Sequence, residues 1–312
     1  MKKTILTIAA ILILVFLFYA FFVKTVHKKE IIVNEPFSKI SPQLSDIKNI
    51  SKWYLPFASA DIEKLVFKDN NKAVLGSDTI VLDKIDEGGN WIKATTRDGT
   101  AMLLFNFSPD TGKATKVSLE YENTLVNELI KGNSIIENAK KSLANLNPYF
   151  LDSKKMYGYN IEISTVTDTA FLFTSQVVAI SEKKKFITIL FEKLITRSGK
   201  NKNEYNGTRI FYSSPIANDS IHLFAGIGIT NTQQVDITGD ISLKRMPFKM
   251  NLLHTFYQGS FSKMNEPIEA LGKFKEDNNL VSMAIPFIKF KTDGIEFADD
   301  QIIQAIACYP VF

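Results

Sequence analysis

Hydrophobic residues dominate the start of the chain and leave no polar face. From Thr4 to Val23 the sequence reads TILTIAAILILVFLFYAFFV and contains no charged residue. About 20 such residues are what a helix needs to cross a bilayer, and the surface helix of a soluble protein would show a polar stripe. The pattern therefore predicts a transmembrane helix at residues 4–23, within an anchor segment that covers residues 1–29.

The end of this apolar stretch argues against cleavage. A secretory signal usually has an apolar core of about 7–15 residues followed by small residues. Bulky aromatic residues, among them Phe21 and Phe22, end this one instead. Lysines flank the stretch on both sides, so the positive-inside rule fixes no orientation. We favour a single-pass bacterial signal-anchor that places the rest of the chain outside the cytoplasm.

Short strands followed by one helix are predicted for the next segment. Ser134 and Glu137 fit a capping box, and apolar residues at spacings of three or four mark an amphipathic helix that ends near Pro148. Before it, turn dipeptides separate short runs rich in β-branched and aromatic residues, which predicts an antiparallel meander. The expected strands are Glu63–Phe67, Lys72–Leu75, Thr79–Ile85, Trp91–Thr96, Met102–Phe107 and Thr115–Glu122.

A second group of strands and helices follows the polar segment Leu151–Gly158, which we take as the domain boundary. Helices are expected at Lys184–Arg197 and from about Glu266, where Pro267 suits a first helical turn. Two further strands end the chain, and the whole pattern is a strand-rich α+β arrangement. The other expected strands are Tyr159–Val166, Ala170–Ile180, Thr208–Tyr212, Ile221–Ile229 and Phe248–Tyr257.

Charge and composition narrow the function classes. The net charge of +4 comes from 37 basic and 33 acidic residues, but five of the basic residues are lysines that flank the apolar stretch. Without them the chain from Glu30 onward carries 32 basic and 33 acidic residues, a balance of −1. A nucleic-acid-binding domain would need a basic face, so direct nucleic-acid binding is not expected. The single Cys308 and three histidines offer little for a metal site, and we expect no metal and no cofactor.

Four segments of the C-terminal half carry a family resemblance. They are NGTRIFY (Asn206–Tyr212), FAGIGI (Phe224–Ile229), TFYQGSFSKM (Thr255–Met264), and PFIKF together with the terminal ACYPVF. In this order they resemble the GyrI-like small-molecule-binding domain, the effector-binding domain of AraC-type and multidrug-responsive regulators. The resemblance covers residues 157–312. It implies two pseudo-symmetric strand-helix units with a ligand cleft between them.

A fainter resemblance covers residues 30–156. SDIKNISKWYLPF (Ser45–Phe57) and the helical segment Ile135–Phe150 are similar to the SRPBCC or START-like helix-grip domain, including its polyketide cyclase-like members. This implies a sheet wrapped around a long helix, with an apolar cavity between them. Trp53 and Trp91 would line that cavity or fill it, and we favour filling.

The chain departs from the GyrI-like pattern at positions that carry chemistry. The family strand that corresponds to PFIKF usually has an acidic residue that meets cationic ligands, whereas Lys289 stands at or beside it here. A lysine would repel such cations. The family turn "H-x-G-x-Y" is replaced by Tyr257, Gly259 and Phe261, so its histidine and its tyrosine hydroxyl are both missing. Hydrolysis by this domain is therefore not expected, and we assign no catalytic residue.

Aromatic residues on the expected strands are the best candidates for ligand contacts. Strand alternation sends about half of them to one face. Any one of them is more often a core residue, but a set on one face suits a flat hydrophobic ligand, with Tyr212 or Tyr257 as a polar group. Glu162 and Arg209 are further charged candidates. The predicted ligand-binding residues are Phe173, Tyr212, Phe224, Tyr257, Phe287 and Lys289.

The sequence thus favours a membrane-anchored, non-enzymatic protein that binds a small hydrophobic molecule in the GyrI-like cleft. The SRPBCC-like domain would be a second cavity or a partner module. One alternative is a hydrolase or cyclase with a small hydrophobic substrate, which requires a pair of titratable groups that converge in a pocket. A second is a regulatory module that acts through a protein partner, since the chain shows no helix-turn-helix segment.

Overall fold

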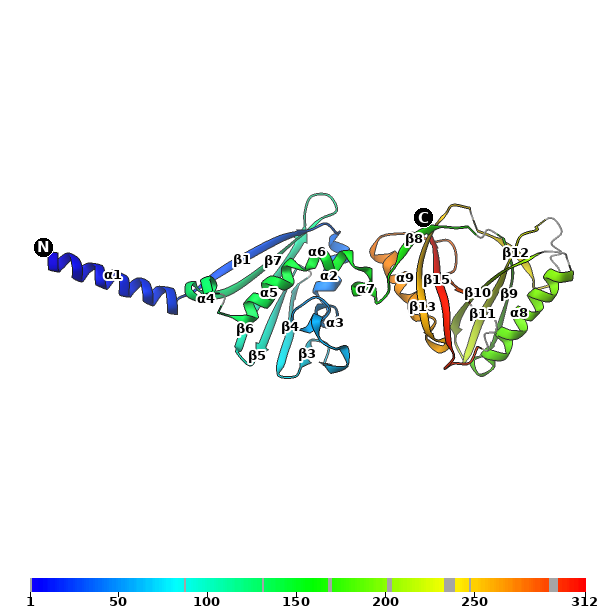
Figure 1. Ribbon diagram of the computed structural model, residues 1–312, viewed down its shortest axis with the longest axis horizontal. Helices are drawn as coiled ribbons and strands as arrows, with labels where there is room; N and C mark the ends of the chain where they lie inside the picture. The colour runs from blue at the N-terminus through cyan, green and yellow to red at the C-terminus, as the bar shows by residue number, and fades with distance from the viewer. Residues whose placement is uncertain are drawn as a thin grey trace. The chain divides into compact units, whose positions relative to one another are not determined.

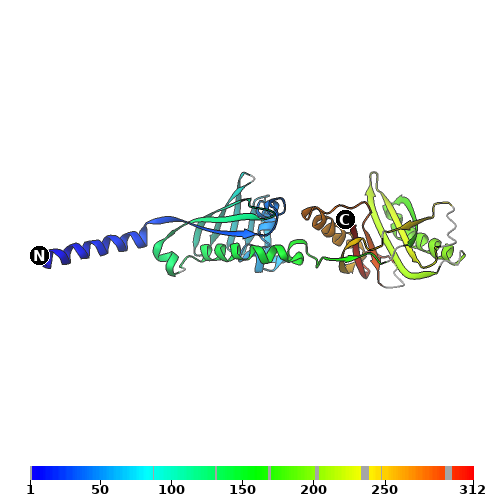
Figure 2. The same cartoon turned by 90° about the horizontal axis from the view of Figure 1, so that it is seen from above.

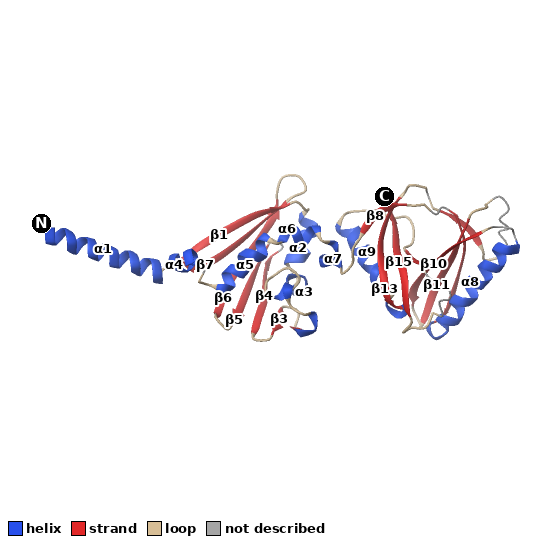
Figure 3. Cartoon of the chain, viewed as in Figure 1, coloured by secondary structure: helices blue, strands red, loops and turns tan. Residues whose placement is uncertain are grey.

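The computed structural model describes residues 2–86, 88–130, 132–167, 170–200, 204–232, 239–246, 248–291 and 297–312. The chain divides into two compact units, Met1–Asp152 and Ser153–Phe312. Each unit contains one large antiparallel sheet, and an apolar helix precedes the first (Figure 1, Figure 3). The α+β class predicted from the sequence is confirmed.

Helix α1 (Lys2–Phe22) is the apolar N-terminal segment. Among the helices of the described residues, α1 alone is long and apolar enough to cross a membrane. Its mean hydropathy over Ile5–Phe22 is 2.9. A signal sequence meets the same criteria, so the anchor and its orientation stay predictions. Only Val23 separates α1 from strand β1 (Lys24–Val33). Residues 24–29, which we assigned to the anchor segment, therefore form part of the first sheet.

The first sheet has the strand order β1-β7-β6-β5-β4-β3-β2. Every neighbouring pair is antiparallel, and β1 pairs with β7 from Lys24 opposite Thr124 to Val33 opposite Thr115. The meander is as expected, and β1 adds to its far edge. The other strands are β2 (Leu65–Lys68), β3 (Lys72–Leu75), β4 (Asp78–Asp86), β5 (Gly89–Thr96), β6 (Gly99–Pro109) and β7 (Thr115–Thr124).

Helix α5 (Ser134–Ala144) packs along the first sheet (Figure 2). Its N-cap is Asn133, whose side chain accepts hydrogen bonds from the backbone of Ile135 and Ile136 at 3.1 and 3.2 Å. The expected capping box is therefore wrong: Ser134 is the first residue of the helix and its hydroxyl donates to Asp98 at 2.8 Å, while Glu137 pairs with Lys140. The shorter helices of this unit are α2 (Phe37–Leu44), α3 (Ile47–Ile50), α4 (Leu125–Ile130) and α6 (Leu146–Leu151).

Side chains fill the space between α5 and the first sheet. Trp53 is 3% exposed and packs edge-on against Phe105, and its indole Nε1 donates to the carbonyl oxygen of Gln43 at 3.1 Å. Tyr149 donates to the side chain of the same Gln43 at 3.1 Å. The space beside Tyr54 measures about 10 Å³, room for no more than about one water. Trp53 is thus buried between α5 and the sheet, and filling of a cavity there stays a prediction, whereas Trp91 alternates with the buried Ile92 and points to the outer face.

The second sheet has the strand order β12-β9-β11-β10-β14-β15-β13-β8. Helices α8 (Lys183–Lys200) and α9 (Glu266–Asp277) pack on it, and α7 (Ser153–Tyr157) begins the unit. Residues on one face of the sheet, such as Phe211 and Ala225, form the core with α8 and α9. The strands are β8 (Glu162–Thr165), β9 (Ala170–Ala179), β10 (Tyr205–Ile216), β11 (Ser220–Ile229), β12 (Ser242–Arg245), β13 (Asn251–Ser260), β14 (Phe287–Phe290) and β15 (Ile302–Val311).

Candidate functional site

The face of the second sheet that turns away from α8 and α9 carries the candidate site. Because side chains alternate along a strand, residues paired across neighbouring strands share one face. One such row crosses five strands and consists of Phe173, Gly226, Ile210, Lys289 and Ile306. This row brings together aromatic, aliphatic and cationic groups that lie up to 133 positions apart in the sequence.

Two adjoining cavities lie on this face, and together we call them the groove. The larger measures about 380 Å³ and the smaller about 340 Å³. Both fall in the range of small-molecule sites, and they share Phe171, Met246 and Phe287. The larger is also lined by Phe173, Ile210, Tyr212, Phe224, Lys244, Arg245 and Met283, and the smaller by Leu252, His254, Lys289, Ile306 and Cys308.

Gly226 makes room on the floor of the groove. A Cβ atom at this position would lie 2.8 Å from Cγ1 of Ile210, so only glycine leaves the Ile210 side chain its place. At Gly228 a Cβ atom would lie within 3.0 Å of the Asn206 side chain. Both glycines lie within strand β11, so the Gly-Ile-Gly sequence is part of the sheet and not a phosphate-binding loop.

Replacing Gly226 with valine should displace Ile210 into the groove. We expect a loss of about 1 kcal/mol in stability, because the core on the opposite face is untouched. We expect about a tenfold loss in affinity for a groove ligand, measured by titration of the full chain. The matched control is Gly199→Val, in α8 of the same unit, where the backbone is not left-handed and a Cβ meets no atom within 4 Å. Equal affinity in the Gly226→Val variant would show that the floor of the groove does not contact the ligand.

The charged groups around the groove are basic. Lys244 and Arg245 line the larger cavity and Lys289 lines the smaller, and the described residues that line the two cavities include no aspartate or glutamate. The ammonium of Lys244 lies 5.9 Å from the ring centroid of Phe173. Glu162 lies at the edge of the sheet, 3.9 Å from Nε2 of His254. The groove therefore presents cations beside aromatic walls.

The groove gathers five of the six predicted ligand-binding residues. Phe173, Tyr212, Phe224 and Phe287 line the larger cavity, and Lys289 lies beside Phe287 in the smaller one.

Tyr257 lies on the other face of the sheet. It is 5% exposed in the core, and its hydroxyl donates to the carbonyl oxygen of Ser260 at 2.7 Å. Burial raises its pKa. Arg209 also turns toward the helices, with its guanidinium 6.0 Å from the Phe191 ring.

Two parts of the groove are missing from the predicted set. Phe171 is one of them: it lies opposite Gly228 in the strand register and packs beside Phe287. The loop after α9 supplies Met283 and Ile285. The backbone N–H of Phe312 donates a hydrogen bond of 2.8 Å to the carbonyl oxygen of Val281, which holds that loop to the C-terminal residue. A loop has no periodicity, so no sequence pattern indicated its contribution. Among the described residues no three histidine, cysteine, aspartate or glutamate side chains group as metal ligands.

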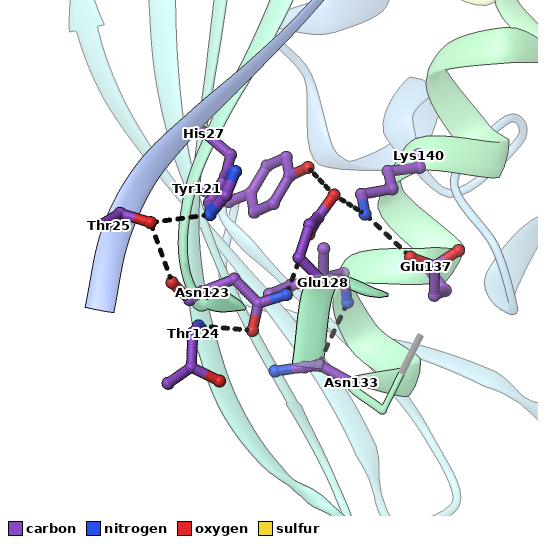
Figure 4. A network of polar contacts seen from close by, with 10 residues as sticks. Thr25, His27, Tyr121, Asn123, Thr124, Glu128, Asn133, Glu137 and Lys140 are labelled. Atoms are coloured by element: carbon purple, nitrogen blue, oxygen red, sulfur yellow. Dashed lines mark hydrogen bonds and ion pairs between the residues drawn. The ribbon is translucent and has the colours of Figure 1, made fainter. Parts of the chain in front are cut away.

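The first unit contains a cluster of titratable groups around Glu128 (Figure 4). Its carboxylate accepts hydrogen bonds from Tyr121 at 3.0 Å, Asn123 at 3.0 Å and Lys140 at 2.5 Å. Burial alone would raise the pKa of Glu128, but these three donors outweigh it and hold the pKa at about 2. Such a carboxylate is a weak base at neutral pH. The cluster therefore holds α4 against β7 and α5.

Comparisons with known proteins give only distant similarities. No family model matches the chain, and no curated protein matches it. The crystal structure of the EcmrR C-terminal domain is similar at 14% identity. The similarity covers 49% of this chain and 98% of that domain, with a TM-score of 0.35. An uncharacterized conserved protein from Listeria innocua is similar at 16% identity over 53% of this chain and 98% of its own, with a TM-score of 0.35. The crystal structure of Ara h 8.0201 is similar at 13% identity over 41% of this chain and 99% of its own, with a TM-score of 0.29.

Proposed function

We propose that this chain is a non-enzymatic protein, anchored to a membrane by α1, that binds a small molecule with an apolar body and a negative charge. The observation that carries the proposal is the groove: it has aromatic walls, and the charged side chains among its described lining residues are basic. GyrI-like relatives usually meet cations. The lysine noted in the sequence reverses this preference.

The aromatic walls suit a flat ligand. The rings of Phe173 and Phe224 lie 6.1 Å apart between centroids, and those of Tyr212 and Phe224 lie 5.8 Å apart. A planar apolar ligand that covers these rings gains hydrophobic burial together with favourable ring contacts. Tyr212 is half-buried and offers a hydroxyl at the wall.

The basic side chains decide the sign of the ligand's charge. Water is partly excluded beside the aromatic walls, so a charge there interacts more strongly than in bulk water. An anion in the larger cavity gains from Lys244 and Arg245, and one in the smaller cavity gains from Lys289, whereas a cation would be repelled in either. Charge thus supplies specificity, and the aromatic walls supply most of the affinity.

Two dyes with one aromatic body separate these contributions. 1-Anilinonaphthalene-8-sulfonate carries a sulfonate, and N-phenyl-1-naphthylamine is the same body without it. We expect the full chain in phosphatidylcholine nanodiscs, after subtraction of empty nanodiscs, to bind the anionic dye about tenfold more tightly by titration calorimetry. Replacing Lys244, Arg245 and Lys289 together with glutamine should remove most of this difference and leave the neutral dye unchanged. Equal affinities would overturn the charge preference, and binding of neither dye would overturn the proposed function.

The hydrolase or cyclase alternative has less support. A general base in the groove would have to come from its lining, and the described lining offers His254 but no carboxylate. Glu128 is held by three donors in the first unit.

A further inference from the structure

Helix α4 presents large apolar side chains to the outside. Leu129 is 73% exposed and Ile130 is 68% exposed, and no residue of this six-residue helix is buried. We call these two residues the α4 patch. Helices of a water-soluble surface usually turn such residues inward, so the patch needs an apolar partner.

Glu128 fixes the direction in which the α4 patch points. The three hydrogen bonds to Glu128 come from β7 and α5, on the inner side of α4 (Figure 4). The hydroxyl oxygen of Thr124 accepts a further hydrogen bond, of 3.3 Å, from the backbone N–H of Asn127. The helix is thereby held by its polar side, and its apolar side is left free to meet a partner.

The strand register places the α4 patch beside the end of α1. Lys24, which follows α1 after one residue, pairs with Thr124, which directly precedes α4. Helices α1 and α4 are in contact. Among the α1 residues whose burial is described, Ala20 is the buried one, with 4% of its surface exposed. The patch therefore lies at the level where the apolar stretch of α1 ends.

We propose that the α4 patch inserts into the interfacial region of the bilayer that α1 crosses, and so holds the first unit against the membrane surface. This rests on the anchor assigned to α1 under the proposed function. The bilayer is the favoured occupant because the uncharged stretch of α1 ends at Val23, where a bilayer surface would lie. Lys24 then has its ammonium at the headgroup level, a common position for lysine at the end of a span.

Depth-dependent fluorescence quenching tests this placement. The only cysteine, Cys308, is replaced with serine, and single cysteines are introduced as Leu129→Cys, Lys113→Cys and Phe18→Cys. Each full-length variant is labelled with an environment-sensitive nitrobenzoxadiazole dye in phosphatidylcholine nanodiscs. Lipids then carry a nitroxide quencher either near the headgroup or near the end of the acyl chain. Residue 113 is the matched control, because it precedes the ten-residue strand β7 whose other end leads into α4, about 33 Å away.

We expect the label at residue 129 to be quenched by the shallow nitroxide, at residue 18 by the deep one, and at residue 113 by neither. If residue 18 is quenched and residue 129 behaves like residue 113, the α4 patch does not enter the bilayer and the anchor stands. A label at residue 129 shielded only at high protein density would indicate a second copy and would also overturn the proposal. If residue 18 is not quenched, the anchor itself is wrong.

Discussion

Replacing Trp53 with alanine should lower the free energy of unfolding of the first unit by about 4 kcal/mol. The indole is almost fully buried, contacts Phe105 edge-on, and donates its N–H to the Gln43 backbone. Truncation removes the packing and leaves that carbonyl without its donor. Urea unfolding of the full chain measures the loss, and the tryptophan that each variant retains reports on it by fluorescence, because both tryptophans of the chain lie in the first unit.

Trp91→Ala is the matched control for this prediction. Trp91 lies on the outer face of β5 and is only partly buried, so its truncation should cost about 1 kcal/mol or less. If the two variants are equally stable, Trp53 does not fill the interior, and the first unit retains room for a ligand.

Replacing Lys140 with methionine should destabilise the first unit by about 2 kcal/mol at pH 7. The ammonium is 9% exposed and pairs with Glu128 at 2.5 Å and with Glu137 at 2.8 Å. Burial lowers the pKa of Lys140, but its hydrogen bonds to these carboxylates outweigh burial and leave the pKa raised. Its loss leaves two partly buried carboxylates without their cation.

The Lys140 effect should depend on pH in a defined direction. The pKa of Glu128 is about 2 in the folded chain and 4.5 ordinarily, so its contribution is fully present above pH 4.5 and is lost as the pH falls toward 2. The stability difference between the natural chain and the Lys140→Met variant should therefore shrink between pH 4.5 and pH 2. Lys141→Met, on the exposed side of the same helix, should have little effect. A difference that is constant with pH would show that Lys140 acts through packing alone.

Periodicity indicated the sheets and most of the groove, but it left the face of individual residues open. Phe256 and Tyr257 are neighbours on strand β13 and therefore point to opposite faces of the sheet. The sequence does not show which of the two faces the cleft. The structure buries Tyr257 against the helices and leaves Phe256 50% exposed on the other face. Phe173, Phe224 and Phe287 were also predicted as cleft residues, and these three do lie on the face that carries the groove.

Other features depended on contacts between distant segments. Strand β1 starts at Lys24 because it pairs with β7, a hundred positions further along the chain, and no local pattern of the lysine-rich segment showed it. Asn133 caps α5, and the Ser134 hydroxyl donates instead to the distant Asp98 at 2.8 Å. The role of Gly226 in the floor of the groove follows only from its position opposite Ile210 on the neighbouring strand.

The groove is tested most directly by the methyl signals of the seven methionines of the full chain in nanodiscs. Met246 and Met283 line the larger cavity, whereas Met102 lies 47% exposed on β6 of the first unit. With ¹³C-methyl-labelled methionine and added 1-anilinonaphthalene-8-sulfonate, we expect the signals of Met246 and Met283 to shift with saturation, and that of Met102 to stay. A saturable shift of Met102, with Met246 and Met283 unchanged, would contradict a binding site in the groove.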